Sequence, residues 1–391
     1  MKKRVKIFIF ILIVLVLGVL GIIIKGLNTH GQIEPFMPTI ITEPYTDIYL
    51  PVSSYPIDVD GNGLVDYLVV EFETNLSNEE NYDISGILLG ENEDYISSSG
   101  KIVDFSNKRI IQLNFSGLGI RSKEMGGKFR FGNVYVIGDN TRLNIQNKTY
   151  FTQNYNKNDF EYQSHLLECG KIVLPNLVYI LDNNLNTSGD CFNVQTGNII
   201  LNLNEHIISG DGSGIGIYES YQSNVSIKNG RISNFSKGME IRHSNNNIIT
   251  NLFIGSNKGD GINNGQGIDF LLSNYNLISN NTFDNNEGDA INLDGSSSNN
   301  ISNNNFTSGF RAGVYLLGSN NNTIKENFIM NSQYIGIYLN QASGNQITNN
   351  TISLTKFWGI YVEKSSVDQN IISNNTLSKN GRKGIYFEEI T

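Results

Sequence analysis

Three carboxylates in or beside a repeated motif could carry out acid–base chemistry. The motif reads Gly-apolar-x-apolar; its third residue is Glu240 in one copy and Asp269 in the next, and Asp289 precedes the copy after that. Cleavage of a glycosidic bond uses two carboxyl groups about 5–10 Å apart. Residues on neighbouring copies of a stacked repeat would meet that spacing, so Glu240, Asp269 and Asp289 are the candidate catalytic residues.

The same motif position, with Arg242 beside it, supplies side chains that could hold a sugar. Aromatic rings stack on sugar rings, amides bond hydroxyl groups, and a guanidinium binds an acidic sugar or stabilises an enolate-like charge. The candidate substrate-binding residues are Arg242, Asn292, Tyr315, Tyr338, Tyr361 and Tyr386. The alternative is that the tyrosines reflect ordinary strand preference and that the acids only keep the protein soluble.

A second group of oxygen-bearing side chains lies near residue 60, in Asp58-Val-Asp60-Gly-Asn62-Gly-Leu-Val-Asp66. This spacing lets a short loop wrap a cation of Ca²⁺ size. Val69 stands where a complete EF-hand loop has Glu, so the segment resembles dockerin-like or thrombospondin-type calcium loops. We expect Asp58, Asp60, Asn62 and Asp66 to bind a structural calcium ion. The alternative is a turn whose carboxylates cap backbone amides.

The motif is repeated with a period near 23 residues. Its starts run from Cys169 to Gly384, separated by 22, 23, 24, 29, 23, 23, 23, 23 and 25 residues. Short apolar steps without a helix-forming stretch predict one coil of a parallel β-helix per repeat. Leucine-rich repeats have a similar length but require Leu-x-x-Leu-x-Leu and a helical segment, which the sequence lacks. The longest coil inserts a loop around 255–267, beside Glu240 and Asp269, where we expect function.

Stacking of the coils superposes equivalent residues. The first and third residues after each start are apolar and should fill the interior, whereas the second should form one outward stripe. That stripe is predicted to contain Lys171, Asn193, Gly216, Glu240, Asp269, Asn292 and the four tyrosines. Side-chain amides should likewise bond along the axis at Asn281, Asn304, Asn327, Asn350 and Asn375, which accounts for much of the high total of 58 Asn.

The two cysteines test this register. Cys169 and Cys191 are 22 residues apart, which is one coil. Their Cα atoms should therefore lie within the range of about 4.4–6.8 Å that a disulfide requires. We expect them to pair, because the chain is predicted to lie outside the cytoplasm.

Sequence motifs in the first coils indicate a family. The segments are Cys169-Gly, Tyr179, Cys191-Phe, Leu201-Asn-Leu-Asn, Ile208-Ser-Gly-Asp-Gly and Asn-Val-x-Ile-x-Asn-Gly at 224–230. With the Asn-Asn-x-Ile repeats, residues 160–391 resemble the right-handed parallel β-helix family, in particular its NosD-like and other carbohydrate-binding or sugar-hydrolysis members. The resemblance implies a substrate groove on the lateral face. Glu205 departs from the family pattern, which often has Gly there.

The NosD-like resemblance also suggests copper handling as a distant alternative. Copper sites require clustered His, Met or Cys. The four histidines are dispersed, and Met239 falls on the interior register. The histidines are His30, His165, His206 and His243.

The N-terminus predicts membrane attachment. Lys2, Lys3, Arg4 and Lys6 precede an uncharged apolar run from 7 to 24, which as a helix reaches roughly 27 Å. A cleaved signal peptide is the alternative, although no Ala-x-Ala-like site is present. We expect residues 1–25 to be an uncleaved signal anchor and 26–56 a Pro-containing stalk. The protein would then be a single-pass cell-membrane protein with most of the chain extracellular.

Residues 57–152 show period-2 apolar patterns typical of a small antiparallel β-sandwich. The predicted strands are 67–74, 82–89, 109–115, 128–137 and 141–150. The fold prediction is therefore all-β: a membrane helix and stalk, this sandwich, and a right-handed parallel β-helix of about ten coils at 153–391.

Charge and composition narrow the function. A net charge of −9 argues against nucleic-acid partners, which select basic surfaces. The first hypothesis is a membrane-anchored extracellular carbohydrate-binding or structural surface protein, with a polysaccharide or surface glycan as partner. The alternative is a polysaccharide lyase, hydrolase or epimerase. An uncapped last strand also suggests self-association at the C-terminal edge.

Overall fold

The computed structural model describes residues 48–74, 81–104, 110–138, 142–146, 150–258, 265–364 and 369–388. The predicted signal anchor 1–25 and most of the predicted stalk lie outside these residues. Within the described residues, no helix is long and apolar enough to cross a membrane.

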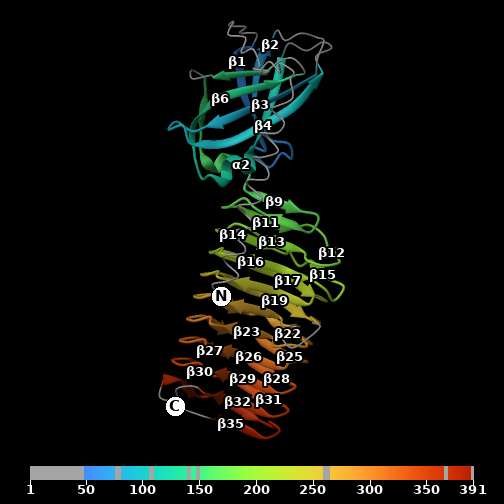
Figure 1. Cartoon of the computed structure of the whole chain (residues 1–391), viewed down its shortest axis with the longest axis vertical. Helices are drawn as coiled ribbons and strands as arrows, with labels where there is room; N and C mark the ends of the chain where they lie inside the picture. The colour runs from blue at the N-terminus through green and yellow to red at the C-terminus, as the bar shows by residue number, and fades with distance from the viewer. Residues whose placement is uncertain are drawn as a thin grey trace, which may run out of the picture. The chain divides into compact units, whose positions relative to one another are not determined.

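The N-terminal module consists of two antiparallel sheets, with strand orders β1-β2-β5 and β4-β3-β6-β7; β8 also pairs with β6 (Figure 1). The elements are β1 (Ile48–Ile57), β2 (Tyr67–Thr74), β3 (Asn81–Leu89), β4 (Tyr95–Asp104), β5 (Ile110–Ser116), α2 (Gly117–Ser122), β6 (Gly127–Ile137), β7 (Arg142–Gln146), β8 (Phe151–Tyr155) and η1 (Lys157–Asp159). Phe72 and Phe115 of the first sheet lie 5.9 and 6.1 Å from Phe131 of the second, between ring centroids. The two sheets therefore share one apolar core, as the period-2 patterns predict.

The ends of this module differ from the predicted boundaries. Strand β1 occupies the last part of the expected stalk, although it contains Pro51 and Pro56. It lies at the edge of its sheet, where a missing proline N–H is tolerated. At the other end, Tyr155 and Phe160 belong to the same buried core, so its packing extends past residue 152.

The C-terminal part is a parallel β-helix, with ten strands of one sheet stacked in chain order (Figure 1). These strands are β10 (Gly170–Ile172), β13 (Phe192–Val194), β16 (Ile215–Ser220), β18 (Lys237–Arg242), β20 (Ile268–Leu271), β23 (Ile291–Asp294), β26 (Ala312–Leu317), β29 (Ile335–Asn340), β32 (Trp358–Glu363) and β35 (Lys383–Glu388). One strand per repeat confirms the predicted parallel β-helix.

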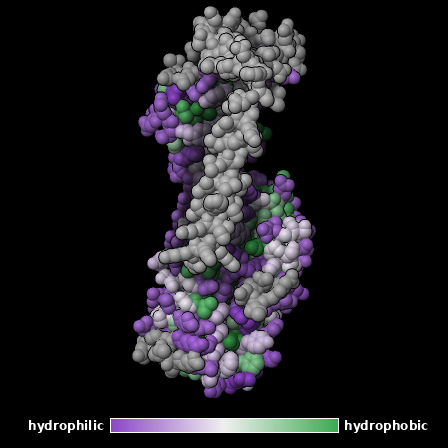
Figure 2. Space-filling model, viewed as in Figure 1, coloured by the Kyte–Doolittle hydropathy of each residue, from purple (hydrophilic) through white to green (hydrophobic). Residues whose placement is uncertain are grey.

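The remaining strands form the other faces of the coils, and two long strands, β17 and β19, run through two faces each. One set is β9 (Gln163–Leu166), β11 (Val178–Leu181), β14 (Ile199–Asn202), β17 (Val225–Ser233), β19 (Ile248–Gly255), β21 (Leu277–Ser279), β24 (Asn300–Ser302), β27 (Thr323–Lys325), β30 (Gln346–Thr348) and β33 (Ile371–Ser373). The other is β12 (Leu185–Asn186), β15 (Ile207–Ser209), β22 (Thr282–Asp284), β25 (Asn305–Ser308), β28 (Phe328–Met330), β31 (Thr351–Ser353) and β34 (Thr376–Ser378). Most of the coloured surface in Figure 2 is hydrophilic, because the apolar positions point inward.

The predicted register is wrong in the third coil. Tyr218 pairs with Asn193 on one side and Glu240 on the other, so Tyr218 rather than Gly216 lies in the outward stripe. A Cβ on Gly216 would lie 2.5 Å from the carbonyl oxygen of Gly238, so this position requires glycine. The segment Gly-Ile-Gly-Ile fits two registers equally well, since a shift of two residues keeps every side chain on its face.

Side-chain amides in successive coils are stacked along the axis of the β-helix, as the sequence predicts. Asn281 donates from Nδ2 to Oδ1 of Asn304 at 3.1 Å, and Asn304 donates to Asn327 at the same distance. A second ladder, which the sequence analysis missed, runs through Asn276, Asn299, Asn322, Asn345 and Asn370. The left-handed backbone belongs to the residue before the ladder position, for example Asn280 with φ 57° and Asn303 with φ 56°.

The predicted disulfide is present. Cys169 and Cys191 are bonded, with their Cα atoms 4.6 Å apart. The bond joins the first two coils of the ten-stranded sheet, where β10 pairs with β13.

Candidate functional site

The central row of the ten-stranded sheet is the outward stripe. Each residue pairs directly with the next: Lys171, Asn193, Tyr218, Glu240, Asp269, Asn292, Tyr315, Tyr338, Tyr361 and Tyr386. Charged and amide side chains thus occupy the middle of the row, and tyrosine rings occupy its C-terminal part. Residues 259–264 of the enlarged coil lie outside the described residues.

A lysine joins the two central carboxylates. Lys237 Nζ donates to Glu240 at 2.8 Å and to Asp269 at 2.5 Å. Arg242 forms an ion pair with the other oxygen of Glu240, and Asn292 Nδ2 donates to Asp269 at 2.7 Å. Burial lowers the pKa of Lys237, but Asp269 and Glu240 outweigh it and leave that pKa raised. We call these five residues the polar cluster.

Asp289 serves as an anchor for a neighbouring arginine. It is 1% exposed, and both carboxylate oxygens contact the guanidinium of Arg311, with Nε at 3.0 Å. The backbone N–H of Ala312 donates to the same carboxylate at 3.0 Å. Burial raises the pKa of Asp289 against the opposing effect of Arg311. With both oxygens engaged by Arg311, Asp289 orients that arginine and, among the described residues, forms no ion pair with Lys237; the charge of Asp269 also raises the pKa of Asp289.

Asp294 is the acid that the candidate set omitted. It lies two residues beyond Asn292 on β23 and therefore shares its outward face. Among the described residues, no hydrogen bond or ion pair engages its carboxylate, unlike those of Glu240 and Asp269. Burial and the charge of Asp269 raise the pKa of Asp294. A carboxyl group that keeps its proton to higher pH can act as a general acid.

Two buried acceptor oxygens at this site have no hydrogen-bond partner, Gln266 Oε1 and Asn292 Oδ1. An unmet buried acceptor costs about 1–3 kcal/mol. The orientation of Asn292 is fixed, because its other end must donate to the carboxylate of Asp269. Gln266 is 4% exposed and lies three residues before Asp269. Both oxygens would be satisfied by a ligand that brings hydroxyl or other N–H or O–H donors.

The tyrosines of the central row stack on one another. Ring centroids are 4.7 Å apart for Tyr315 and Tyr338, 4.8 Å for Tyr338 and Tyr361, and 5.6 Å for Tyr361 and Tyr386. Cations lie over the two ends: Arg311 is 5.2 Å from the ring of Tyr315, and Lys383 4.4 Å from that of Tyr386. The ring faces are therefore covered by protein groups, and a sugar ring has no room to stack between them.

The hydroxyl groups of this stack are also engaged. Tyr338 donates to Glu363 and Tyr361 donates to Glu388. Burial and these carboxylates raise the pKa of both tyrosines. Asn340 also has an unpartnered oxygen here. Its amide lies 3.4 Å from the hydroxyl of Tyr315, which can donate, so turning the amide over would satisfy that oxygen.

A carboxyl group inside the β-helix follows from the corrected register. Glu219 is fully buried and takes an interior position that is apolar in most other coils. Asn247 Nδ2 donates to it at 2.8 Å. Burial raises the pKa of Glu219 to about 7. It lies inside the coil, away from the polar cluster on the outer face.

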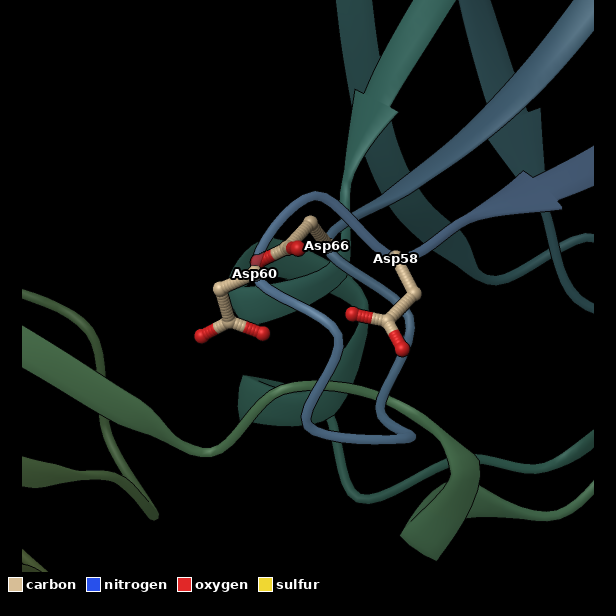
Figure 3. Close-up of side chains that lie close together, drawn as sticks. All are labelled: Asp58, Asp60 and Asp66. Atoms are coloured by element: carbon tan, nitrogen blue, oxygen red, sulfur yellow. The ribbon is translucent and has the colours of Figure 1, made fainter.

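The predicted calcium ligands occupy one loop between β1 and β2 (Figure 3). Carboxylate oxygens of Asp58, Asp60 and Asp66 all lie within 4.8 Å of one another, which suits a hard cation. Asn62 lies beside them and donates to Asp60 at 3.0 Å and to the distant Glu161 at 2.9 Å. The carboxylate of Asp58 also accepts hydrogen bonds from backbone N–H groups. The bond from the N–H of Gly63 lowers the pKa of Asp58 most. The donor set thus fits calcium, and the same oxygens cap the turn.

Two of the histidines considered for copper have other partners. His165 contacts Asp182 at 2.8 Å, and His243 stacks on Tyr221 with ring centroids 4.6 Å apart. His30 lies outside the described residues. These contacts do not form a clustered copper donor set.

Residues 266–389 match the family described as the right handed beta helix region. The match covers about a third of the chain, and over these residues the sequence is that of a right-handed β-helix. The match names no NosD-like subgroup. No curated protein matches the chain.

Solved structures that are similar to this chain share little sequence with it. One is a DFA-IIIase from Arthrobacter chlorophenolicus A6 without its lid, with 11% identity, a TM-score of 0.43, and coverage of 58% of this chain and 65% of that one. Another is an alginate lyase from Paenibacillus sp. str. FPU-7, with 16% identity, a TM-score of 0.42, and coverage of 56% and 93%. A third is a periplasmic alginate epimerase, with 12% identity, a TM-score of 0.37, and coverage of 55% of this chain and 70% of that one. The chain thus spans just under two thirds of the first of these proteins.

Proposed function

We propose that this protein binds a glycan on the outer face of the ten-stranded sheet, at the polar cluster. The observation that carries the proposal is the unmet oxygen of Asn292, held in place by Asp269. A sugar hydroxyl can donate to it while accepting from a neighbouring cation. Buried polar groups in native proteins are nearly always paired, so an unpaired buried oxygen in a side chain of the outer face supports a ligand that brings donors.

The charge of the site favours a polyhydroxyl ligand. Lys237 and Arg242 neutralise Glu240 and Asp269 one for one, so the cluster holds no surplus cation. A strongly ionic ligand would need such a surplus. Hydroxyl groups both donate and accept, and they match a surface on which carboxylates, amides and cations alternate.

Affinity electrophoresis tests the proposal. Gels containing neutral glucan, xylan, alginate or polygalacturonate should retard the wild-type protein in at least one case. Asn292→Ala should weaken that binding roughly tenfold, as expected from losing one or two hydrogen bonds. Asn193→Ala is the matched control, since Asn193 lies in the same row four positions earlier. Equal losses in both variants, or no retardation by any polymer, would contradict the proposal.

A second candidate is a polysaccharide lyase, hydrolase or epimerase at the same site. It is favoured by Asp294, whose unpaired carboxyl group has a raised pKa beside Asp269. Asp294 would donate a proton while Asp269 acts as base or nucleophile, with Glu240 holding Lys237 in place. Release of uronic acid or of reducing ends from the four polymers measures this activity. Asp294→Asn should abolish turnover while leaving gel retardation intact, and unchanged turnover would exclude this role.

We also propose that the protein is anchored in the cell membrane with its folded part outside. The disulfide supports an oxidising location. Protease added to intact cells should degrade the β-helix module only if it is exposed at the surface. Self-association through the last strand remains a prediction for analytical ultracentrifugation.

A further inference from the structure

Three large side chains line the corner where the ten-stranded sheet ends. Tyr221, His243 and Leu272 occupy the same place in successive coils, because their backbone N–H groups donate to the carbonyl oxygens of Arg242, Leu271 and Asp294 respectively. Tyr221 is 74% exposed and Leu272 46% exposed. We call Tyr221, His243 and Leu272 the corner ridge.

The corner requires left-handed backbone, which disfavours large side chains. The φ angles are 58° at Tyr221, 49° at His243 and 50° at Leu272. The next two coils carry Gly295 and Gly318 at this corner. A non-glycine residue in this conformation costs roughly 1–2 kcal/mol. The chain therefore places a large side chain at this corner in three consecutive coils, and again at Gln341 and Lys364 farther along, although glycine would be less strained.

Two of these side chains form a flat platform. The rings of Tyr221 and His243 are stacked, with an interplanar angle of 6° and 4.6 Å between centroids. In the stack from Tyr315 to Tyr386, cations lie over both end rings. Most of the surface of Tyr221 is open to solvent by comparison.

The platform adjoins the polar cluster through Arg242. Strand β18 ends at Arg242, and His243 follows it directly. Ser220, which precedes Tyr221, pairs with Arg242 on the neighbouring strand. Arg242 in turn contacts Glu240 and is 44% exposed. A ligand lying along β18 would therefore meet the polar cluster and the platform in succession.

We infer that Tyr221 and His243 form an aromatic subsite that stacks against one sugar ring of a glycan whose adjoining part occupies the polar cluster. This inference rests on the proposed function. Sugar rings present an apolar C–H face that packs on an aromatic ring, while their hydroxyl groups reach the polar side chains nearby. A nucleic-acid base also stacks on rings, but the net charge of −9 opposes that partner. The ligand is then at least two linked sugars long and lies along strand β18.

Affinity electrophoresis in gels of neutral glucan, xylan, alginate or polygalacturonate tests the subsite. Tyr221→Ala should weaken binding roughly tenfold, the upper end expected for loss of an aromatic contact. Tyr221→Phe should retain wild-type affinity, because the ring rather than the hydroxyl makes the contact. Tyr67→Ala is the control, since Tyr67 is 41% exposed on strand β2 of the N-terminal module. Circular dichroism confirms that each variant is folded.

The outcomes separate the subsite from the proposed function. Wild-type retardation that Tyr221→Ala leaves unchanged, while Asn292→Ala reduces it, would overturn the subsite alone. Equal losses for Tyr221→Ala and Tyr67→Ala would also overturn it. If no polymer retards the wild-type protein, the proposed function fails and the subsite fails with it.

Discussion

The same face of one sheet carries two different kinds of surface. In coils with Glu240, Asp269 and Asn292, the central row is polar and leaves the oxygen of Asn292 without a partner. In coils from Tyr315 to Tyr386, neighbouring rings cover the ring faces, and the hydroxyl groups of Tyr338 and Tyr361 are bonded. The backbone is the same in both regions. The packed rings stabilise the β-helix, whereas the polar cluster is where we propose that a ligand binds.

The largest expected effect is on stability in the tyrosine region. Tyr361 is 8% exposed and contacts Tyr338, Trp358 and Tyr386. Tyr361→Ala should lower the free energy of unfolding by about 2–4 kcal/mol, because it opens a gap in packed rings. Urea denaturation measures the loss. Glycan affinity should stay unchanged, and a fall in affinity without a loss of stability would give the rings a direct binding role.

The next effect concerns the interior carboxyl group. The pKa of Glu219 is raised from 4.5 to about 7 in the folded protein, so folding favours its neutral form. The stabilisation is complete below the unfolded pKa and is lost as pH rises through about 7, by roughly 3 kcal/mol at most. Denaturation of the wild type and of Glu219→Gln across this range should show stability falling more steeply with pH in the wild type. Parallel curves would contradict the assignment.

A smaller change in stability is expected in the polar region. Asn292→Ala removes one hydrogen bond and one unmet oxygen, so the two effects partly cancel and the free energy of unfolding should change by less than about 1 kcal/mol. The same denaturation experiment checks this value. A loss as large as that of Tyr361→Ala would mean that the polar cluster is structural too.

The smallest effect lies outside the sheet. Calcium bound by Asp58, Asp60 and Asp66 should raise the melting temperature of the N-terminal module by a few degrees, and a chelator should reverse this. Asp60→Asn should remove the response, while the melting of the β-helix stays the same. If the melting temperature of the wild type does not change with calcium, the calcium prediction is wrong and the carboxylates only cap the turn.

The fold could be predicted from the sequence because the regular spacing of a repeat shows which residues superpose in successive coils. Nearly constant spacing placed Cys169 over Cys191 and aligned the asparagine ladder. The predicted register was wrong at Gly216, because two glycines made a shift of two residues equally compatible with the pattern. For the same reason the interior position of Glu219 was not predicted.

The site was less accessible to sequence reasoning. The alignment of Glu240 with Asp269 was predictable, but their bridging by Lys237 depends on side-chain directions that spacing does not report. Tyrosines at equal spacing indicated a sugar platform, yet the short distance between coils stacks them on one another. Tyr221 and His243 lie at a corner outside the motif, so only their left-handed backbone and exposure reveal them.

The central claim is that the polar cluster holds sugar hydroxyl groups. A crystal structure with an oligosaccharide from the polymer that retards the protein tests it most directly. We predict a hydroxyl oxygen about 2.7–3.0 Å from Asn292 Oδ1, beside the carboxylate of Asp269. An oligosaccharide bound only along the tyrosine stack, with Asn292 Oδ1 still unpartnered, would contradict the account.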